Sequence, residues 1–391
     1  MPRKKKKIIL LGSCIMKEIG LYLHIPYCKR KCTYCNFHFS TQFSTRKELL
    51  DALHLEIRSR STEVQDARVS TIYFGGGTPS VLSPSELHEI LLIIKTHYDC
   101  LSVQETTLEA NPDDLNPFYL DQLLILGIDR LSIGIQSFYD HHLEWMNRSH
   151  NATQGLNAIQ QAKIAGFTKL SADLIFGIPL CTDEEWLQNL ELMKANELPH
   201  LSCYALTVEE KTELHHRIEK NKMPPLMDEH TIRQMSLMLD FMQRNDYEAY
   251  EISNFSQTGH RAIHNSNYWN GLPYLGFGPS AHSYLGNSRR WNIANNNLYL
   301  KNVLQDQSYF ESETLSKKDQ YNEFIMLQLR RCEGLDLDKL TGFEFSWISE
   351  TKKTLEGYVE SGHLKCSGNT YTLTREGIYI CDKISSEAFA E

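Results

Sequence analysis

Short apolar runs alternate with longer amphipathic stretches from Leu21 to about Ala205, and this alternation constrains the fold more than any other feature of the chain. A short apolar run bounded by turn residues is typical of a buried strand, whereas apolar residues three and four positions apart are typical of a helix. The predicted strands are residues 21–25, 71–74, 106–110, 130–135, 170–175 and 202–206. The predicted helices between them are residues 47–60, 83–96, 117–126, 152–165 and 183–195.

Repeated strand–helix units predict an α/β fold with a parallel sheet. Six units are fewer than the eight that close a barrel, so we expect a partial (β/α)6 TIM-like barrel over residues 16–250. In such sheets ligands bind at the carboxyl ends of the strands. Candidate functional residues are therefore expected there.

At 391 residues the chain is longer than one core usually supports, which predicts a second domain. A further helix is expected at residues 230–244, followed by an irregular haem- or ligand-binding segment over 251–310 that is rich in Gly, Asn and Tyr. Residues 311–391 are expected to form a small helical domain, in which helix 351–362 and strands 364–366 and 371–373 resemble a winged helix. We favour a packing role for this domain.

Cys28, Cys32 and Cys35 stand at C-x3-C-x2-C spacing directly after the first predicted strand. Three thiolates on a tight loop can ligate three irons of a 4Fe-4S cluster and leave the fourth iron open to a small molecule. The alternative is a zinc site, but zinc needs a fourth protein ligand at a second paired spacing, and none is evident nearby. Tyr34 and Phe37 are expected to place aromatic cover around the cluster.

The other seven cysteines are scattered singly, which favours reduced thiols and a cytoplasmic location. The net charge of −9 argues against nucleic acid as the main partner. Residues 1–15 are interpreted as an N-terminal extension: Lys4–Lys7 precede only four apolar residues, too few for a signal peptide, and translation from Met16 is an alternative. No window is apolar enough to cross a membrane, so stable membrane insertion is not expected.

Polar or glycine-rich groups follow successive predicted strands. The second strand continues into Gly75, Gly76, Gly77 and Thr78, and glycines allow a ligand to approach the backbone closely. Later strands carry further polar side chains at or near their ends. The third predicted strand carries Glu109, the fourth is followed by Gln136 and then Arg148, and the fifth carries Asp173. Each one alone could be an ordinary surface residue, but together they predict one site at the strand ends.

The segment 22–39 resembles the cluster loop of radical S-adenosylmethionine (SAM) proteins. The order and spacing of the motifs resemble the family that contains the oxygen-independent coproporphyrinogen III oxidases (HemN) and their HemW relatives. The resemblance implies a 4Fe-4S cluster on Cys28, Cys32 and Cys35, with SAM bound to its open iron. It also implies that Tyr22, Gly76, Gly77, Thr78 and Glu109 surround this SAM, and that Gln136, Arg148 and Asp173 match positions that touch a second SAM in the oxidases.

Two features separate the subfamilies. The oxidases carry a further cysteine where this chain has Phe37, and they have a longer segment ahead of the cluster than the 27 residues before Cys28. Residues 264–269, His-Asn-Ser-Asn-Tyr-Trp, resemble the HNxxYW signature of the HemW type, which implies haem binding with His264 as a candidate ligand. Histidine is a common axial ligand of haem iron. His282 is a second candidate, although an ordinary loop histidine is the simpler interpretation.

The resulting hypothesis is a haem chaperone that hands haem to an unidentified acceptor protein. The first alternative is a coproporphyrinogen III oxidase, which would use a radical from SAM to decarboxylate the propionate side chains. The second is a binding module whose winged-helix-like tail reads nucleic acid or a partner protein. The sequence assigns no catalytic residue, leaves productive SAM cleavage undecided and leaves a homodimer open.

Overall fold

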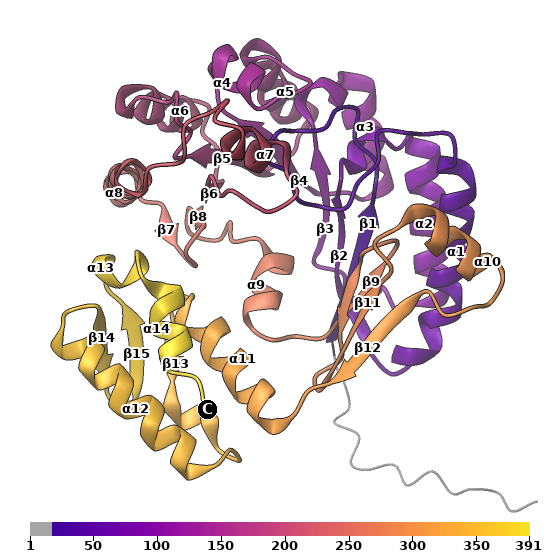
Figure 1. Cartoon of the computed structure of the whole chain (residues 1–391). Helices are drawn as coiled ribbons and strands as arrows, with labels where there is room; N and C mark the ends of the chain where they lie inside the picture. The colour runs from indigo at the N-terminus through magenta and orange to yellow at the C-terminus, as the bar shows by residue number, and fades with distance from the viewer. Residues whose placement is uncertain (1–17) are drawn as a thin grey trace, which may run out of the picture.

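The computed structural model describes residues 18–391 and is built on one open, twelve-stranded sheet (Figure 1). Its strand order is β12-β11-β10-β9-β1-β2-β3-β4-β5-β6-β8-β7. Seven neighbouring strands run parallel: β9 (Tyr274–Phe277), β1 (Glu18–Ile25), β2 (Arg68–Gly76), β3 (Glu105–Ala110), β4 (Arg130–Gln136), β5 (Lys169–Phe176) and β6 (His200–Ala205). The six predicted strands and the partial barrel are confirmed.

Antiparallel strands extend both ends of the parallel region. Beside β6 lie β8 (Asn254–Ser256) and β7 (Glu248–Ala249). Beside β9 lie β10 (His282–Tyr284), β11 (Ser288–Asn292) and β12 (Phe310–Thr314). β12 is the outermost strand, and four of its five residues are exposed.

Helices cover the outer side of the parallel strands (Figure 1). They are α1 (Arg46–Arg60), α2 (Pro84–His97), α3 (Pro117–Leu126), α4 (Asp140–Trp145), α5 (Ala152–Ala165), α6 (Asp183–Ala195) and α8 (Asp228–Arg244). Helix α7 (Glu213–Glu219) instead packs against the loop after β1, where the Leu214 N–H donates to the Thr33 carbonyl oxygen at 2.8 Å. Helices α2, α5 and α6 each begin with a capping box, at Ser83, Asn151 and Thr182, which satisfies two free N–H groups at each start. Since local signals of this kind set the helix ends, the predicted helices agree with the observed ones to within two residues.

The segment 251–310 is not irregular, and that prediction was wrong. It contains helices α9 (Ile263–Trp269) and α10 (Asn296–Leu304) and contributes strands to the main sheet, including β9 beside β1. Most of these strands have only three to five residues, which is too short for a hydrophobic period to show in the sequence. The short helices α4 and α7 were missed for the same reason.

The C-terminal residues form a small unit with its own core, drawn in orange to yellow in Figure 1. Its elements are α11 (Lys317–Leu329), β13 (Leu335–Asp336), α12 (Phe345–Glu360), β14 (Leu364–Ser367), β15 (Thr370–Leu373), α13 (Arg375–Ile378) and α14 (Cys381–Glu387). The predicted helix and hairpin are confirmed. The unit contacts the sheet domain through hydrogen bonds, among them Gln328 Nε2 to the Trp269 carbonyl oxygen at 3.0 Å and Arg375 Nη2 to the Ser236 carbonyl oxygen at 2.7 Å.

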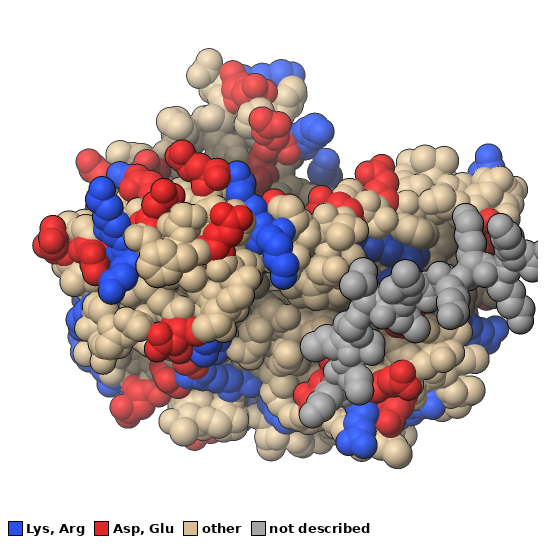
Figure 2. All heavy atoms as spheres, turned by 90° about the horizontal axis from the view of Figure 1, so that it is seen from below, with Lys and Arg blue, Asp and Glu red and all other residues tan. Residues whose placement is uncertain are grey.

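Acidic and basic side chains are interspersed on the face shown in Figure 2. The predicted N-terminal extension, residues 1–15, and Met16 lie outside the described residues. Within residues 18–391, no helix has the length and apolar character needed to cross a membrane.

Candidate cofactor site

The loop that carries Cys28, Cys32 and Cys35 leaves the carboxyl end of β1 and is held by backbone hydrogen bonds on both sides. The Cys28 N–H donates to the Ser40 carbonyl oxygen (3.1 Å), and the Thr33 N–H donates to the Met146 carbonyl oxygen (3.1 Å). Beyond these bonds, the Asn147 side chain donates to the Lys31 carbonyl oxygen at 2.7 Å. The segment after α4 therefore fixes the middle of the loop.

Two side chains donate hydrogen bonds to the cysteine sulfurs. Thr78 Oγ1 lies 3.3 Å from Cys28 Sγ, and Arg148 Nη1 lies 3.4 Å from Cys32 Sγ. Burial raises the pKa of the Cys28 thiol to about 12 and that of the Cys35 thiol to about 11, so a metal must displace protons when it binds. Donors aimed at sulfur stabilise the thiolates that result.

The spacing of the sulfurs fits a cluster better than a single ion. Around one zinc ion, with Zn–S bonds of about 2.3 Å, sulfurs would lie roughly 4 Å apart. Among the described residues, only a set elsewhere in the chain brings three metal-binding atoms within 4.8 Å of one another, so at least one pair of the three cysteine sulfurs is farther apart than 4.8 Å. A 4Fe-4S cluster needs that wider spacing because each sulfur binds a different iron.

The glycine loop after β2 packs directly against the start of the cluster loop. The Gly77 N–H donates to the Ile25 carbonyl oxygen (2.9 Å) and the Thr78 N–H to the Tyr27 carbonyl oxygen (2.8 Å). A Cβ atom at Gly77 would lie 2.8 Å from both of these carbonyl oxygens. Gly76 has a φ of +106°, a conformation that side-chain-bearing residues rarely adopt. Only glycine fits at these two positions.

Glu109, at the end of β3, faces the glycine loop. Its carboxylate accepts hydrogen bonds from Tyr73 Oη (2.7 Å) and the Gly76 N–H (3.2 Å). Burial raises the pKa of Glu109 to about 7, and nearby Asp173 contributes to the rise. Tyr22, in register with Tyr73 on the neighbouring strand, stacks on it with ring centroids 6.0 Å apart. An acidic group that a cationic ligand would stabilise is thus held rigidly beside the cluster loop.

Gln136, Arg148 and Asp173 extend the site across β4 and β5. Gln136 ends β4 with a φ of +64°, and its side chain and that of Arg148 both lie over Gly134, whose missing Cβ leaves them room. Arg148 Nη2 donates to Asn111 Oδ1 (2.5 Å) and to the Gly134 carbonyl oxygen (2.8 Å). Asp173 accepts from Ser132 Oγ (3.0 Å), and burial raises its pKa to about 6.

His264 lies in the first turn of α9 and is buried against the face of the sheet that carries Thr71 and Tyr73. Its Nδ1 is 2.7 Å from Thr71 Oγ1 and its Nε2 is 2.9 Å from Tyr268 Oη, so both ring nitrogens are hydrogen-bonded. The ring stacks on Tyr73 at 4.9 Å, and burial lowers the pKa of His264 to about 3. His264, the first residue of the signature, therefore contacts the same tyrosine that donates to Glu109.

Comparisons with known proteins agree with this geometry. Residues 22–193 match the radical SAM superfamily, and residues 315–380 match the HemN C-terminal domain. The chain is 31% identical over 325 residues to the heme chaperone HemW of Lactococcus lactis, covering 83% of this chain and 85% of the relative. The chain belongs to the HemW family of radical SAM proteins.

Other relatives extend over most of the chain. A mouse relative of this HemW-family chain, the mitochondrial radical S-adenosyl methionine domain-containing protein 1, is 34% identical over 383 residues, covering 93% of this chain and 86% of its own. The solved structure of the coproporphyrinogen III oxidase HemN from Escherichia coli superposes with a TM-score of 0.84 at 21% identity, over 96% of this chain and 90% of that one. The latter likeness establishes the fold. Membership of the radical SAM proteins implies a 4Fe-4S cluster and SAM.

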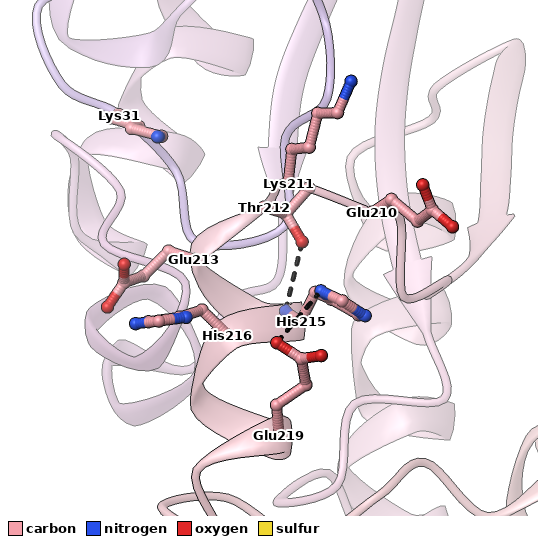
Figure 3. A pocket seen from close by; sticks show the side chains of 8 residues that line it. All are labelled: Lys31, Glu210, Lys211, Thr212, Glu213, His215, His216 and Glu219. Carbon is pink, nitrogen blue, oxygen red and sulfur yellow. Dashed lines mark hydrogen bonds and ion pairs between the residues drawn. The ribbon is translucent and has the colours of Figure 1, made fainter.

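Phe37 was expected to cover the cluster loop, and in this HemW-family chain it does not. Its side chain is 68% exposed. It lines a surface groove of about 470 Å³ that also includes Cys35 and Lys31. A second pocket, of about 390 Å³, shares Lys31 and is lined mainly by charged and polar residues around the start of α7 (Figure 3). Solvent therefore reaches the loop from this side. His282 is also exposed, at the start of β10.

Several residues of the site were missed from sequence. Tyr73 could have been found because it lies directly across from Tyr22 on the neighbouring strand. Asn111 follows Glu109 at the same strand end, where polar residues were already expected. Lys29 forms ion pairs with Asp113 (2.8 Å) and Asp114, and these could not have been found, because no local pattern links residues more than eighty positions apart.

Proposed function

We propose that this chain is a haem chaperone, which binds haem and transfers it to acceptor proteins. The observation that carries the proposal is its kinship with proteins named heme chaperone HemW, including 30% identity to the Mycobacterium tuberculosis protein over 94% of each chain. The HNxxYW-like signature on α9 supports the same assignment. The acceptor and the way in which haem is attached are left to experiment.

In this proposal Cys28, Cys32 and Cys35 hold the cluster, with Thr78 and Arg148 as donors to sulfur. Tyr22, Gly76, Gly77, Thr78 and Glu109 surround the SAM bound to the cluster. Gln136, Arg148 and Asp173, which match positions that touch a second SAM in the oxidases, are proposed as further SAM contacts. When bound, the cluster supplies an electron and an iron with an open coordination position. The glycines allow close approach, and Glu109 favours the positive charge of SAM.

His264 is proposed as the haem ligand, with a specific condition. Because both ring nitrogens are engaged, the first turn of α9 must open before Nε2 can reach iron. Opening would exchange the Tyr268 hydrogen bond for an iron–nitrogen bond. The test is a hemin titration of the His264→Ala variant with His282→Ala as the matched comparison. An unchanged Soret spectrum in His264→Ala would remove His264 as ligand.

The function itself is tested with cluster-loaded protein under anaerobic conditions. Hemin titration should produce a Soret shift that saturates at a fixed stoichiometry, and addition of an apo-haem protein should then transfer the absorption to that acceptor. Incubation of the same sample with coproporphyrinogen III, SAM and reductant should give no protoporphyrinogen by chromatography. Failure to bind hemin, or turnover of the porphyrinogen, would overturn the chaperone assignment.

We further propose that the protein acts in the cytoplasm and does not use nucleic acid as a partner. The net charge of −9 and the mixed charges of the face in Figure 2 support the latter, because phosphate binding needs concentrated positive charge. Retention on duplex DNA at physiological salt would contradict it.

A further inference from the structure

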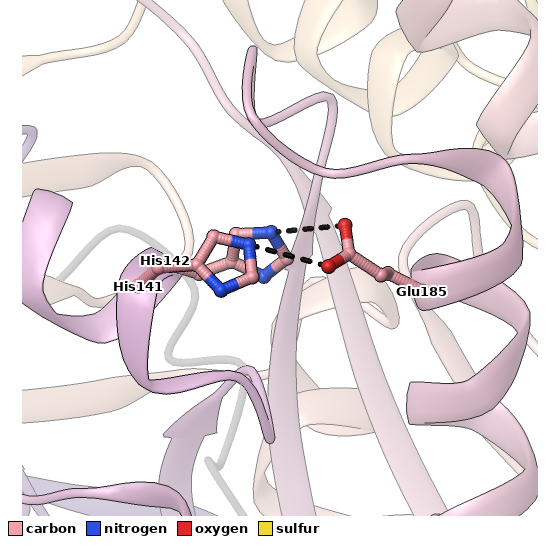
Figure 4. Close-up of side chains that lie close together, drawn as sticks. All are labelled: His141, His142 and Glu185. Atoms are coloured by element: carbon pink, nitrogen blue, oxygen red, sulfur yellow. Dashed lines mark ion pairs between the residues drawn. The ribbon is translucent and has the colours of Figure 1, made fainter.

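Outside the cofactor site, His141, His142 and Glu185 form a compact cluster of metal-binding side chains (Figure 4). One ligand atom from each residue lies within 4.8 Å of the other two, and this is the one such set in residues 18–391. In Figure 4 the two imidazole rings lie side by side, and the carboxylate of Glu185 faces them. Two imidazoles and a carboxylate are a common ligand set for zinc and related ions.

The three residues come from two neighbouring strand–helix connections. His141 and His142 lie in α4, which follows β4, and Glu185 lies in the first turn of α6, which follows β5. Strands β4 and β5 are paired in parallel, so both connections leave the same edge of the sheet. The ligands are thus held by regular elements.

The distances suit a single small cation. His141 Nε2 lies 3.2 Å from Glu185 Oε1, and His142 Nε2 lies 3.5 Å from Glu185 Oε2. A tetrahedral ion with bonds of about 2.0–2.1 Å separates its ligand atoms by roughly 3.3 Å. The two observed separations lie on either side of that value.

His142 directs its buried Nε2 toward Glu185. Its side chain is fully buried, and Nε2 makes no hydrogen bond in the structure. Its Nδ1 is hydrogen-bonded to Ser137 Oγ at 2.8 Å. Ser137 Oγ accepts from the Tyr139 N–H at 3.2 Å and from Asn189 Nδ2 at 3.4 Å, so it is held in place. Metal-bound histidines are usually oriented in this way through the second ring nitrogen. A buried unpartnered nitrogen is unfavourable unless something binds it.

A simple ion pair explains the cluster less well. The two ring centroids are only 4.1 Å apart, so an ion pair that charged both imidazoles would place two positive charges in contact. Neutral imidazoles could donate N–H groups to the carboxylate, but they would leave its negative charge without a positive partner. Glu185 Oε2 is also used locally, since it accepts from the Thr182 N–H (2.9 Å) in the capping box of α6. A dication satisfies both neutral imidazoles and the carboxylate at once.

We propose that His141, His142 and Glu185 bind a divalent transition-metal ion of the zinc class, with water completing its coordination. His141 is 49% exposed, which gives the ion a route from solvent and leaves room for water. The ion joins the connection after β4 to the connection after β5. Because the residues directly after α4 hold the cluster loop, through Met146 and Asn147, the site stabilises the scaffold of that loop.

The test measures Zn²⁺ binding to the cluster-loaded protein, since occupied cluster cysteines cannot bind the added zinc. Competition with a chromophoric chelator should give one zinc per chain, and X-ray absorption should show nitrogen and oxygen ligands. His141→Ala and Glu185→Gln should each weaken binding at least tenfold. Glutamine can still complete the capping box, so the second variant removes charge without removing the cap.

The matched control is His215→Ala, which disrupts another partly exposed histidine–glutamate pair, with Glu219 at 3.7 Å. His216 follows His215 on α7, but these residues do not form a three-ligand set of the kind found at His141, His142 and Glu185. This variant should bind zinc as the parent protein does. Excess Zn²⁺ should also raise the melting temperature of the parent and the control but not of the two variants. No zinc binding, sulfur ligands in the absorption spectrum, or equal affinity in His141→Ala would each overturn the proposal.

Discussion

Glu109 shows how one buried side chain can connect cofactor binding to pH. An isolated carboxyl titrates near 4.5, but burial raises the pKa of Glu109 to about 7, so in the free protein it is mostly neutral at pH 6 and mostly charged at pH 8. A cationic ligand within about 4–6 Å of a carboxylate favours the charged form by one or more pKa units. The affinity for a cation should therefore rise with pH through 7.

This argument predicts the behaviour of Glu109→Gln. SAM affinity of the cluster-loaded protein, measured by calorimetry, should rise roughly tenfold between pH 6 and pH 8 because of Glu109. The variant should lack this component of the rise. SAM and the cluster also titrate, and they do so in both proteins. The contribution of Glu109 is therefore the difference between the parent and the variant in the slope of SAM affinity against pH. Equal slopes would show that Glu109 does not face the ligand.

Arg148 should tune the cluster through its hydrogen bond to Cys32. In Arg148→Met the reduced, more negative cluster loses a positive neighbour, so its reduction potential should fall. A hydrogen bond to a charged group contributes about 1.5–3 kcal/mol, and 59 mV corresponds to about 1.4 kcal/mol per electron, so the fall can reach about 60–130 mV if the bond forms only in the reduced state. Because the bond exists in both oxidation states, the expected fall is a part of that, on the order of tens of millivolts. Electron paramagnetic resonance during a redox titration measures it.

The control for this change is Arg30→Met. Arg30 Nη1 donates to the Arg148 carbonyl oxygen (3.2 Å) and not to sulfur. The reduction potential of the cluster in Arg30→Met should stay close to that in the parent protein. If the reduction potential fell by the same amount in both variants, the loss of a nearby positive charge would explain the effect, and the hydrogen bond to sulfur would not be needed.

At the scale of elements, the contact between the glycine loop and the cluster loop leaves no room for a methyl group. In Gly77→Ala the new Cβ would press on the Ile25 and Tyr27 carbonyl oxygens, and overpacking of this kind costs about 1–3 kcal/mol. The first cysteine ligand should shift with the backbone, so iron content after reconstitution should fall along with the melting temperature. Gly357→Ala, in the last turn of α12 with open space around it, should instead be neutral or stabilising by up to about 1 kcal/mol.

The elements also show what could be predicted from sequence. Helices such as α5 and α6 were found to the residue because a cap and a 3.6-residue period coincide there. Strand β9 was missed because four residues carry no period and its pairing with β1 joins positions about 250 apart. The candidate site residues came from strand ends, but the burial of His264 depends on where α9 docks, which no local pattern encodes.

At the scale of the whole molecule, α9 is held between the sheet and the C-terminal unit. Gln328 of α11 is buried and donates to the Trp269 carbonyl oxygen at the end of α9. Gln328→Leu should leave that carbonyl unpaired, at a cost of about 1–3 kcal/mol. Hydrogen exchange in residues 263–269 should become at least about fivefold faster, as measured by mass spectrometry.

Met326→Leu, an exposed change on the same helix, is the control and should leave exchange unchanged. The cluster loop should keep its protection in both variants, because its hydrogen bonds lie elsewhere. Unaltered exchange in Gln328→Leu would show that the C-terminal unit does not restrain α9.

The outermost strand, β12, bears on self-association. Its Glu311 and Glu313 are exposed on either side of Ser312, and β12 offers a free row of backbone hydrogen-bonding groups. If two copies joined edge to edge in antiparallel fashion about Ser312, Glu311 of each would oppose Glu313 of the other, and like charges directly opposite are destabilising. The acidic edge thus disfavours the joining of two copies through β12 in this register.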